Sequence, residues 1–401
     1  MSKTKKVPNL RFQGFTDDWE QHKLGDALEE FSYGLNTPAT KFDGKNKYLR
    51  ITDIDDDTHA FNQTSLTSPK DKDDNYILGQ GDILFARTGA SVGKTYMYKA
   101  NDGKVYYAGF LIKGHIKNGF STEFIFNTTR LPQYQNFVKV TSMRSGQPGI
   151  NAKEYQNYVI YVPVKQEQER IGQLISKLDT LITLHQHKLD QLRVLKEILL
   201  QKLFANDQHD KPELRFKDFT DKWEKVKIGS LFTESTEKSA TGQLLSVSIN
   251  KGVYPFDETE RKNNSSKNKS NYKFVEKYDI AYNSMRMWQG AEGVSYYSGI
   301  VSPAYTVLKP QQNSNPEFYA YMFKRAEMLN KFRRYSQGLT SDTWNLKFPI
   351  LKTISLRTTD IKEQEKIVQL LRMVKDNISL QQKKLTQYQQ AKKFLLQQMF
   401  I

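Results

Sequence analysis

The sequence predicts an α+β protein made of two similar halves, each a mixed α/β globular region followed by a long helix. Three observations lead to this prediction. A long helical pattern lies near the middle of the chain, a second copy of it ends the chain, and an aromatic segment is repeated ahead of each globular region. The 401 residues are enough for two to three domains.

Residues 166–204 are expected to form one helix. They contain no proline, their only glycine is Gly172, and apolar residues recur every three or four positions along one face. At roughly 1.5 Å per residue, such a helix is about 58 Å long, which exceeds the diameter of a small domain.

Residues 361–401 repeat this pattern. The pair Glu167-Gln168 recurs as Glu363-Gln364, with an offset of 196 residues (363 against 167). The apolar positions recur at the same offset; among them, Leu174, Leu178, Ile182 and Leu189 return as Leu370, Val374, Ile378 and Leu385. Matching apolar stripes favour two helices packed on each other as a coiled coil over two unrelated amphipathic helices.

A shorter repeat precedes each globular region. Residues 8–25, PNLRFQGFTDDWEQHKLG, return at 212–229 as PELRFKDFTDKWEKVKIG, an offset of 204 (212 against 8). An offset near 200 residues is far longer than a solenoid repeat and matches a domain plus a helix. The chain is therefore interpreted as a tandem duplication.

The first globular region alternates short β-like runs with turn signals. The β-like and helical patterns predict a helix over 123–138 interrupted at Pro132, and strands at 47–51, 76–78, 82–86, 95–98, 105–107 and 158–163. The second region follows the same plan loosely, with a helix over 316–335 that starts with Asn315 as its cap and Pro316 at its first position. Its expected strands are 278–282, 301–308 and 348–356.

Composition limits the classes of function. The chain carries 60 Lys and Arg against 44 Asp and Glu, a net charge of +16, which favours a polyanionic partner such as nucleic acid. The absence of cysteine excludes disulfides, cysteine–zinc sites and thiol nucleophiles, and fits a reducing cytoplasm. No apolar run is long enough to span a membrane, and the N-terminus lacks a signal-peptide pattern.

No catalytic, cofactor or metal site is predicted. Gly89-Ala-Ser-Val-Gly93-Lys94-Thr95 is one residue short of a phosphate-binding loop. Asn315-Pro316-Glu317-Phe318 lacks the second proline of the adenine-methyltransferase motif, and no glycine-rich cofactor turn precedes it. None of the six histidines has the spacing of a metal ligand.

Polar loops at corresponding places in the two halves are the candidate DNA contacts. Arg, Asn and Gln can read base edges, while Lys, Ser and Thr hold phosphates; ordinary surface loops on a basic protein are the alternative. The candidates in the first half are Arg87, Thr88, Ser91, Lys94, Arg144, Ser145, Gln147 and Lys153. Those in the second half are Asn283, Ser284, Arg286, Gln289, Gln337, Thr340 and Ser341.

On these residues the chain resembles the specificity subunits of type I restriction-modification systems. The resemblance rests on the duplicated Leu-Arg-Phe…Phe-Thr-Asp-x-Trp-Glu segment, on Gly81-Asp82-Ile83-Leu84-Phe85-Ala86-Arg87, and on the Glu-Gln-x-x-Ile start of each long helix after Val162-Pro163. It covers nearly the whole chain. The second half departs from it, since Asp279-Ile280 lacks the preceding glycine and Leu356-Arg357-Thr358-Thr359 replaces Val-Pro.

The resemblance implies a fold of two pseudo-symmetric mixed α/β globular target recognition domains separated by two long antiparallel helices that form a coiled coil. The implied boundaries are residues 1–160 and 207–360 for the domains, and 161–206 and 361–401 for the helices. Each domain would read one half of a bipartite, asymmetric DNA site, and the helices would set the spacing and dock the methyltransferase subunits.

The resemblance also implies partners. The chain would be a non-catalytic cytoplasmic subunit without a cofactor. It would bind double-stranded DNA, two adenine-N6 methyltransferase subunits and two ATP-dependent restriction subunits. Two alternatives remain: a fused nuclease or methyltransferase, which needs a carboxylate–metal cluster or a cofactor loop, and a coiled-coil scaffold that binds DNA without sequence preference.

Overall fold

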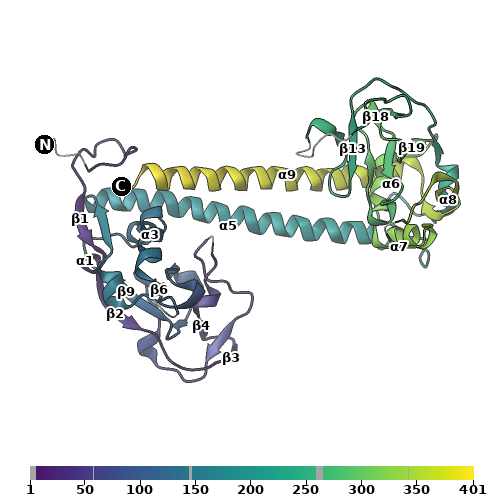
Figure 1. The fold of residues 1–401 in the computed structure, drawn as a ribbon. Coiled ribbons are helices and arrows are strands. Elements are labelled where there is room, and N and C mark those ends of the chain that lie inside the picture. Colours follow the sequence, from purple (N-terminus) through teal and green to yellow (C-terminus); the bar gives the residue numbers. More distant parts are fainter. Residues whose placement is uncertain (1–5, 57, 144–146, 259–264, 342) are drawn as a thin grey trace. The chain divides into compact units, whose positions relative to one another are not determined.

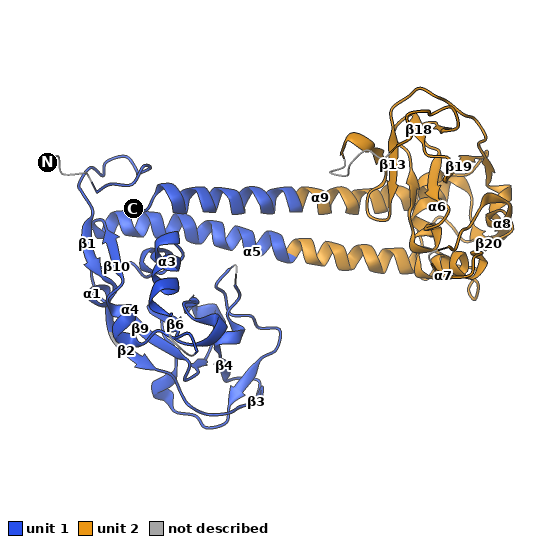
Figure 2. Cartoon of the chain, in the orientation of Figure 1, with its two compact units in different colours: residues 1–187, 382–401 blue, residues 188–381 orange. Residues whose placement is uncertain are grey.

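The computed structural model describes residues 6–56, 58–143, 147–258, 265–341 and 343–401. It divides into two compact units, shown in Figure 2. Unit 1 comprises residues 1–187 and 382–401, and unit 2 comprises residues 188–381. Figure 1 shows two long helices, and each unit contains one globular domain together with a part of both (Figure 2).

The first half of the chain forms the following helices and strands: β1 (Glu20–Lys23), α1 (Leu24–Ala27), β2 (Leu28–Tyr33), β3 (Ala39–Lys41), β4 (Lys47–Leu49), β5 (Thr67–Pro69), β6 (Asp82–Ala86), β7 (Thr95–Met97), β8 (Val105–Tyr107), β9 (Leu111–Ile116), α2 (Thr122–Thr128), α3 (Pro132–Thr141), α4 (Ala152–Gln156), β10 (Val159–Val162) and α5 (Lys165–Lys202). Short 3-10 turns are η1 (Ile51–Asp53), η2 (Asp74–Tyr76), η3 (Gly89–Ser91) and η4 (Ala100–Asp102).

The second half forms β11 (Glu224–Lys227), β12 (Phe232–Glu234), β13 (Leu245–Ser248), β14 (Gly252–Pro255), β15 (Lys273–Val275), β16 (Ile280–Asn283), β17 (Glu292–Val294), β18 (Gly299–Val301), β19 (Tyr305–Pro310), α6 (Pro316–Phe323), α7 (Ala326–Tyr335), α8 (Phe348–Leu351), β20 (Ser355–Thr358) and α9 (Ile361–Gln398). Its 3-10 turns are η5 (Ile228–Ser230), η6 (Phe256–Glu258) and η7 (Met287–Gln289).

The two domains share one topology, which confirms the predicted duplication. A four-stranded antiparallel sheet has the order β2-β9-β6-β7 in unit 1 and β12-β19-β16-β17 in unit 2. A two-stranded sheet, β1-β10 or β11-β20, joins the aromatic segment of each half to the strand ahead of the long helix. The β6–β7 and β16–β17 ladders have the same register: Phe85 pairs with Thr95, and Tyr282 pairs with Glu292. Phe85 and Tyr282 are therefore equivalent positions, as are Thr95 and Glu292.

The long helices run antiparallel within each unit. In unit 1, Ile171 and Ile175 near the start of α5 share a core with Met399 and Phe400 at the end of the chain. In unit 2, Leu199 near the end of α5 shares a core with Ile367 near the start of α9. The predicted helices are thus confirmed, and each domain core is continuous with the helical seam of its own unit.

The aromatic segment of each half sits on the end of a long helix. Leu10 donates its backbone N–H to the carbonyl of Gln398 at 2.8 Å, as Leu214 does to Lys202 at 2.9 Å. Trp19 packs edge-on against Phe124 and Phe400. Trp223 packs edge-on against Phe204 and in a tilted arrangement against Phe318. The N-terminal segment therefore packs on the end of α9, although the two are far apart in the sequence. The second aromatic segment packs on the end of α5, which precedes it directly in the chain.

The strands predicted at 76–78 and at the start of 348–356 were wrong, while the predicted strand-like stretch 301–308 and helical stretch 316–335 are each divided by a turn. Residues 76–78 are not a strand, because Tyr76 ends the turn η2 and Ile77 forms only an isolated bridge with Tyr106. Residues 301–308 span the end of β18 and most of β19. Residues 316–335 form two helices, because the first ends at Phe323 and Arg325 caps the second. Residues 348–356 begin as helix α8, with Pro349 in its first turn, before β20.

Candidate nucleic-acid interface

A buried ion pair attaches each domain to its long helix. The guanidinium of Arg11 contacts both carboxylate oxygens of Glu167, at 2.8 and 2.7 Å. Arg215 does the same with Glu363, at 2.7 and 2.8 Å. Both carboxylates are fully buried, and two-point Arg–carboxylate pairing fixes orientation as well as distance. The repeated Arg and Glu of the sequence motif thus hold the domain on the helix.

The glutamine of the same motif holds the start of a helix in its own domain, α2 in unit 1 and α6 in unit 2. The Gln168 side-chain carbonyl accepts the backbone N–H of Ser121 at 3.0 Å, and Gln364 accepts that of Asn315 at 2.9 Å. Ser121 and Asn315 are the N-caps of α2 and α6. The predicted cap at Asn315, with Pro316 at the first helical position, is confirmed. Glu-Gln-x-x-Ile is therefore a structural motif that orients each domain before any DNA contact is made.

The strand that carries the candidate loops starts from an aspartate-closed turn. Asp82 accepts the N–H of Gly79 at 2.8 Å and pairs with His115 at 2.8 Å. Asp279 accepts the N–H of Glu276 at 2.9 Å, and burial raises its pKa to about 6. The residue ahead of each aspartate has a positive φ, 93° at Gly81 and 76° at Tyr278. Unit 2 thus builds the same turn without the glycine, in a conformation unfavourable for a bulky residue.

In unit 1 the loop after β6 meets the loop after α3. Thr88 pairs with Gly149 as a β-bridge, and Gly89 donates its N–H to the carbonyl of Pro148 at 3.0 Å. The carbonyl of Arg87 accepts the N–H of Ile150 at 2.9 Å. Two segments about sixty residues apart in the sequence therefore form one surface.

The candidates in this surface differ in how free they are. Arg87 stacks over the ring of Tyr33 at 5.0 Å, Gln147 and Lys153 are exposed, and Ser91 is half-buried. The ammonium of Lys94 forms an ion pair with Asp56, so part of its charge is already neutralised. Arg144 and Ser145 lie outside the described residues.

In unit 2 the loop after β16 meets the segment after α7 in the same way. Leu346 donates its N–H to the carbonyl of Ser284 at 2.8 Å, and within the segment after α7 Gln337 forms a β-bridge with Asn345. The rings of Trp288 and Trp344 pack edge-to-face with centroids 5.3 Å apart. Neither tryptophan was among the predicted site residues, although Trp288 lies within the predicted loop.

The unit 2 candidates also differ in their burial and in their hydrogen bonds. Ser284 is buried and hydrogen-bonded to Ala304 and Thr306, which makes it part of the framework. Asn283 caps the turn by accepting the N–H of Met285 at 3.0 Å. The exposed Arg286 donates to Gln289 at 3.2 Å. Gln337, Thr340 and Ser341 are exposed on the second segment.

Beside these loops lies a cavity of about 580 Å³ with further polar groups that the sequence analysis missed, among them Lys273, Asn345 and Lys347. These residues come from two segments about seventy residues apart, so spacing in the sequence contained no signal for them. The candidate groups are hydrogen-bond donors and acceptors suited to base edges and phosphates.

Two features are absent from the described ranges. Within them, no group of three or more His, Asp or Glu side chains is placed to hold a metal ion. None of the helices described is both long and apolar enough to cross a membrane.

The fold and the two loop surfaces define a duplicated recognition protein, with equivalent surfaces on two related domains. The family described as type I restriction modification DNA specificity domain matches residues 16–194 and again residues 220–390. The chain belongs to this family: it is a type I restriction-modification specificity subunit with two DNA-recognition domains. The domains of this family recognise DNA and are not catalytic.

Similar proteins agree with this membership. A putative type I restriction enzyme MjaX specificity subunit of Methanocaldococcus jannaschii is 23% identical over 95% of this chain and 92% of its own length. The MjaVIII specificity subunit of the same organism is 24% identical over 53% of this chain and 48% of its own. A crystal structure of the type I restriction-modification S subunit from M. genitalium, 12% identical, has a TM-score of 0.64 over 98% of this chain and 99% of that one, and so shows a shared fold.

Proposed function

We propose that each globular domain reads one half of a bipartite, asymmetric DNA sequence. The recognition domains are residues 1–160 and 207–360, and the helical segments 161–206 and 361–401 set the distance between the half-sites and dock methyltransferase subunits. The observation that carries the proposal is the paired loop surface. In each unit, the loop after the same sheet strand, β6 or β16, is joined to the segment that follows α3 or α7.

The residues proposed to contact DNA lie at these two surfaces, and none of the described ones is buried. In unit 1 they are Arg87, Thr88, Ser91, Gln147 and Lys153, with Lys94 as a phosphate contact once it leaves Asp56. In unit 2 they are Arg286, Gln289, Gln337, Thr340 and Ser341, while Asn283 and Ser284 shape the loop. Arg144 and Ser145 remain proposed from the sequence alone.

The chain works within a larger cytoplasmic complex. We infer two adenine-N6 methyltransferase subunits and two ATP-dependent translocase–nuclease subunits as partners, with the reactions carried out by the partners. Purified alone, the chain is expected neither to methylate nor to cut DNA. Methyl transfer from S-adenosylmethionine by the partner-free chain would contradict this assignment.

Mapping of adenine methylation tests the function. Cells that carry this gene with its partner subunits should show methylation at one bipartite motif, two defined half-sites separated by a gap of constant length. Cells that carry the partner subunits without this chain are the control. The alternative, a scaffold that binds DNA without sequence preference, would produce no such motif, and that result would reject the proposal.

A further inference from the structure

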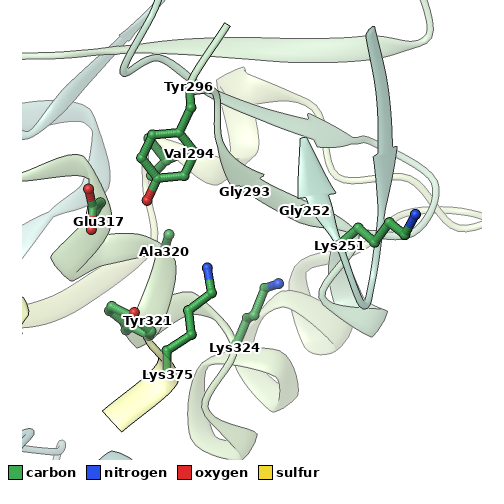
Figure 3. Close-up of a pocket in the computed structure, with 10 residues that line it drawn as sticks. All are labelled: Lys251, Gly252, Gly293, Val294, Tyr296, Glu317, Ala320, Tyr321, Lys324 and Lys375. Carbon is green, nitrogen blue, oxygen red and sulfur yellow. The ribbon is translucent and has the colours of Figure 1, made fainter. Parts of the chain in front are cut away.

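A small cavity in unit 2, here called the notch, is separate from the loop surface. Its volume is about 110 Å³. Figure 3 shows its lining, which comes from the β13–β14 turn, β17, α6 and α9: Lys251, Gly252, Gly293, Val294, Tyr296, Glu317, Ala320, Tyr321, Lys324 and Lys375. This volume is well below the roughly 300–1,000 Å³ of pockets that enclose drug-sized ligands, so the notch suits a single chemical group.

Two ammonium groups and a phenol converge on the notch. In Figure 3, the side chains of Lys324 and Lys375 extend toward the same space as the hydroxyl of Tyr296. Lys324 donates one hydrogen bond, to the carbonyl of Ile249 at 3.1 Å, and an ammonium has three donors. The ammonium of Lys251 points away from them and lies 5.2 Å from the ring of Tyr254.

The carboxylates near the notch do not cancel this charge. Glu317 lines the notch, where it is hydrogen-bonded to Tyr296, and it accepts a charged hydrogen bond from Arg372 at 2.6 Å, so its charge is compensated by Arg372. Asp376, next to Lys375 in α9, interacts electrostatically with Tyr321, and its negative charge contributes to the raised pKa of that phenol. A third acid, Glu292, interacts with Lys324, but burial raises its pKa to about 8, so it is largely uncharged at pH 7. Against Glu317 and Asp376 stand Lys251, Lys324, Lys375 and Arg372, so the described side chains around the notch are net positive.

The equivalent place in unit 1 is neutralised. Arg130 follows the cap Ser121 by nine residues, as Lys324 follows Asn315, and the helix offset of 196 makes Asp179 equivalent to Lys375. Asp179 pairs with Arg130 at 2.7 Å and also with Lys392. In unit 1, Asp179 thus lies between the cations Arg130 and Lys392. In unit 2, the position of that aspartate is taken by Lys375.

We propose that the notch is a phosphate-binding site, and that in the working complex it holds a phosphate of the DNA backbone beside the half-site read by unit 2. The choice of DNA as the source rests on the proposed function. Gly293, which lines the notch, follows Gln289 of the recognition loop by four residues, so their Cα atoms are at most about 14 Å apart even if the chain between them were fully extended. One helical turn of DNA is about 34 Å, so a single duplex can reach both places.

The test compares the salt dependence of DNA binding. The full chain assembled with its methyltransferase subunits is titrated with the mapped target duplex and with a random duplex of equal length. Losing one phosphate contact lowers the slope of log K against log salt by about 1 and weakens both duplexes by the same factor. The double variant Lys324→Gln/Lys375→Gln should show both effects and leave the methylated sequence unchanged.

Two further variants make the result specific. Lys217→Gln/Lys362→Gln removes the same charge from exposed lysines of unit 2 outside the notch and should leave the slope near that of the parent. Lys375→Asp places at this position the acid that unit 1 already accommodates, so the fold should persist while binding falls further. A parent-like slope in both notch variants would overturn the proposal.

Inorganic phosphate and pyrophosphate separate the possible sources of the anion. If either binds the parent but not the Lys324→Gln/Lys375→Gln variant while the DNA slope is unchanged, the notch serves a free anion and the DNA assignment is wrong. If the parent complex shows no preference for its target, the proposed function fails. The slope on the random duplex still decides whether the notch contacts the backbone.

Discussion

Trp223 donates its indole N–H to the carboxylate of Glu363 at 3.2 Å, and the same carboxylate receives both hydrogen bonds from Arg215. Thr359 also donates to it. In the first half Glu167 receives Arg11 in the same way, but the indole nitrogen of Trp19 is buried with no hydrogen-bond partner in the described part of the chain. Among the described residues, the carboxylate of Glu363 therefore accepts more hydrogen bonds than that of Glu167.

The first prediction concerns this carboxylate. Glu363→Gln should destabilise the protein by roughly 3–5 kcal/mol, because the largely buried Arg215 charge would lose its counter-charge. Glu167→Gln should destabilise the protein by about 1 kcal/mol less than Glu363→Gln does, because Glu167 accepts no hydrogen bond from a tryptophan. Denaturant unfolding measures both. Glu365→Gln, an exposed neighbour, is the control and should stay within about 0.5 kcal/mol of the parent; equal costs for all three would contradict the assignment.

The second prediction concerns Glu292, whose carboxylate is fully buried with no hydrogen-bond partner for either oxygen among the described residues. Burial raises its pKa from 4.5 to about 8. Between these values the unfolded chain loses the proton while the folded chain keeps it, so this group's contribution to stability falls as pH rises through the window. At pH 7 the loss is about 3 kcal/mol.

Glu292→Gln removes the titration. The variant should therefore be more stable than the parent at pH 7, with the difference shrinking toward pH 4.5. Unfolding by urea across this range measures it. Thr95 holds the equivalent position in unit 1, so Thr95→Ser is a control that leaves the pH dependence of stability unchanged. The same pH dependence in Glu292→Gln and the parent would show that Glu292 is not buried in its neutral form.

The third prediction concerns the recognition loops. Arg87→Ala should weaken discrimination at one half-site only, and Arg286→Ala or Gln337→Ala at the other. A two-point contact to a base is worth about 1–3 kcal/mol. Binding to duplexes altered in one half-site at a time measures this. A loss of equal size on target and random duplexes would instead assign these side chains to phosphate contacts.

The fourth prediction concerns the length of the helices. Four residues inserted into α5 near His185 add about one turn, roughly 6 Å, which corresponds to one to two base pairs at about 3.4 Å each. The methylated motif should keep both half-sites and widen its gap by about one base pair. A two-residue insertion should do worse, because it turns the apolar stripe, including the buried Leu189, away from the seam. An unchanged gap with full activity would mean that the helices do not set the spacing.

Local patterns in the sequence were sufficient for the repeated architecture. Apolar periodicity placed α5 and α9 within a few residues of their ends, since a long amphipathic helix has a strong signal of its own. The turn at Pro132 and the cap at Asn315 were also readable, because both depend on one residue and its neighbours along the chain. The duplication and the two loop positions followed from comparing the chain with itself.

Contacts between distant segments decided the rest. The sequence showed that Glu167, Gln168, Glu363 and Gln364 recur, but only the fold brings Arg11 and Arg215 to the two glutamates, 156 and 148 residues away. The Trp288–Trp344 pair and the charge of the notch likewise join residues that no local pattern connects. Periodicity reports which face of an element is buried. Which partner covers that face, and whether its charge is compensated, depends on packing between elements far apart in the chain.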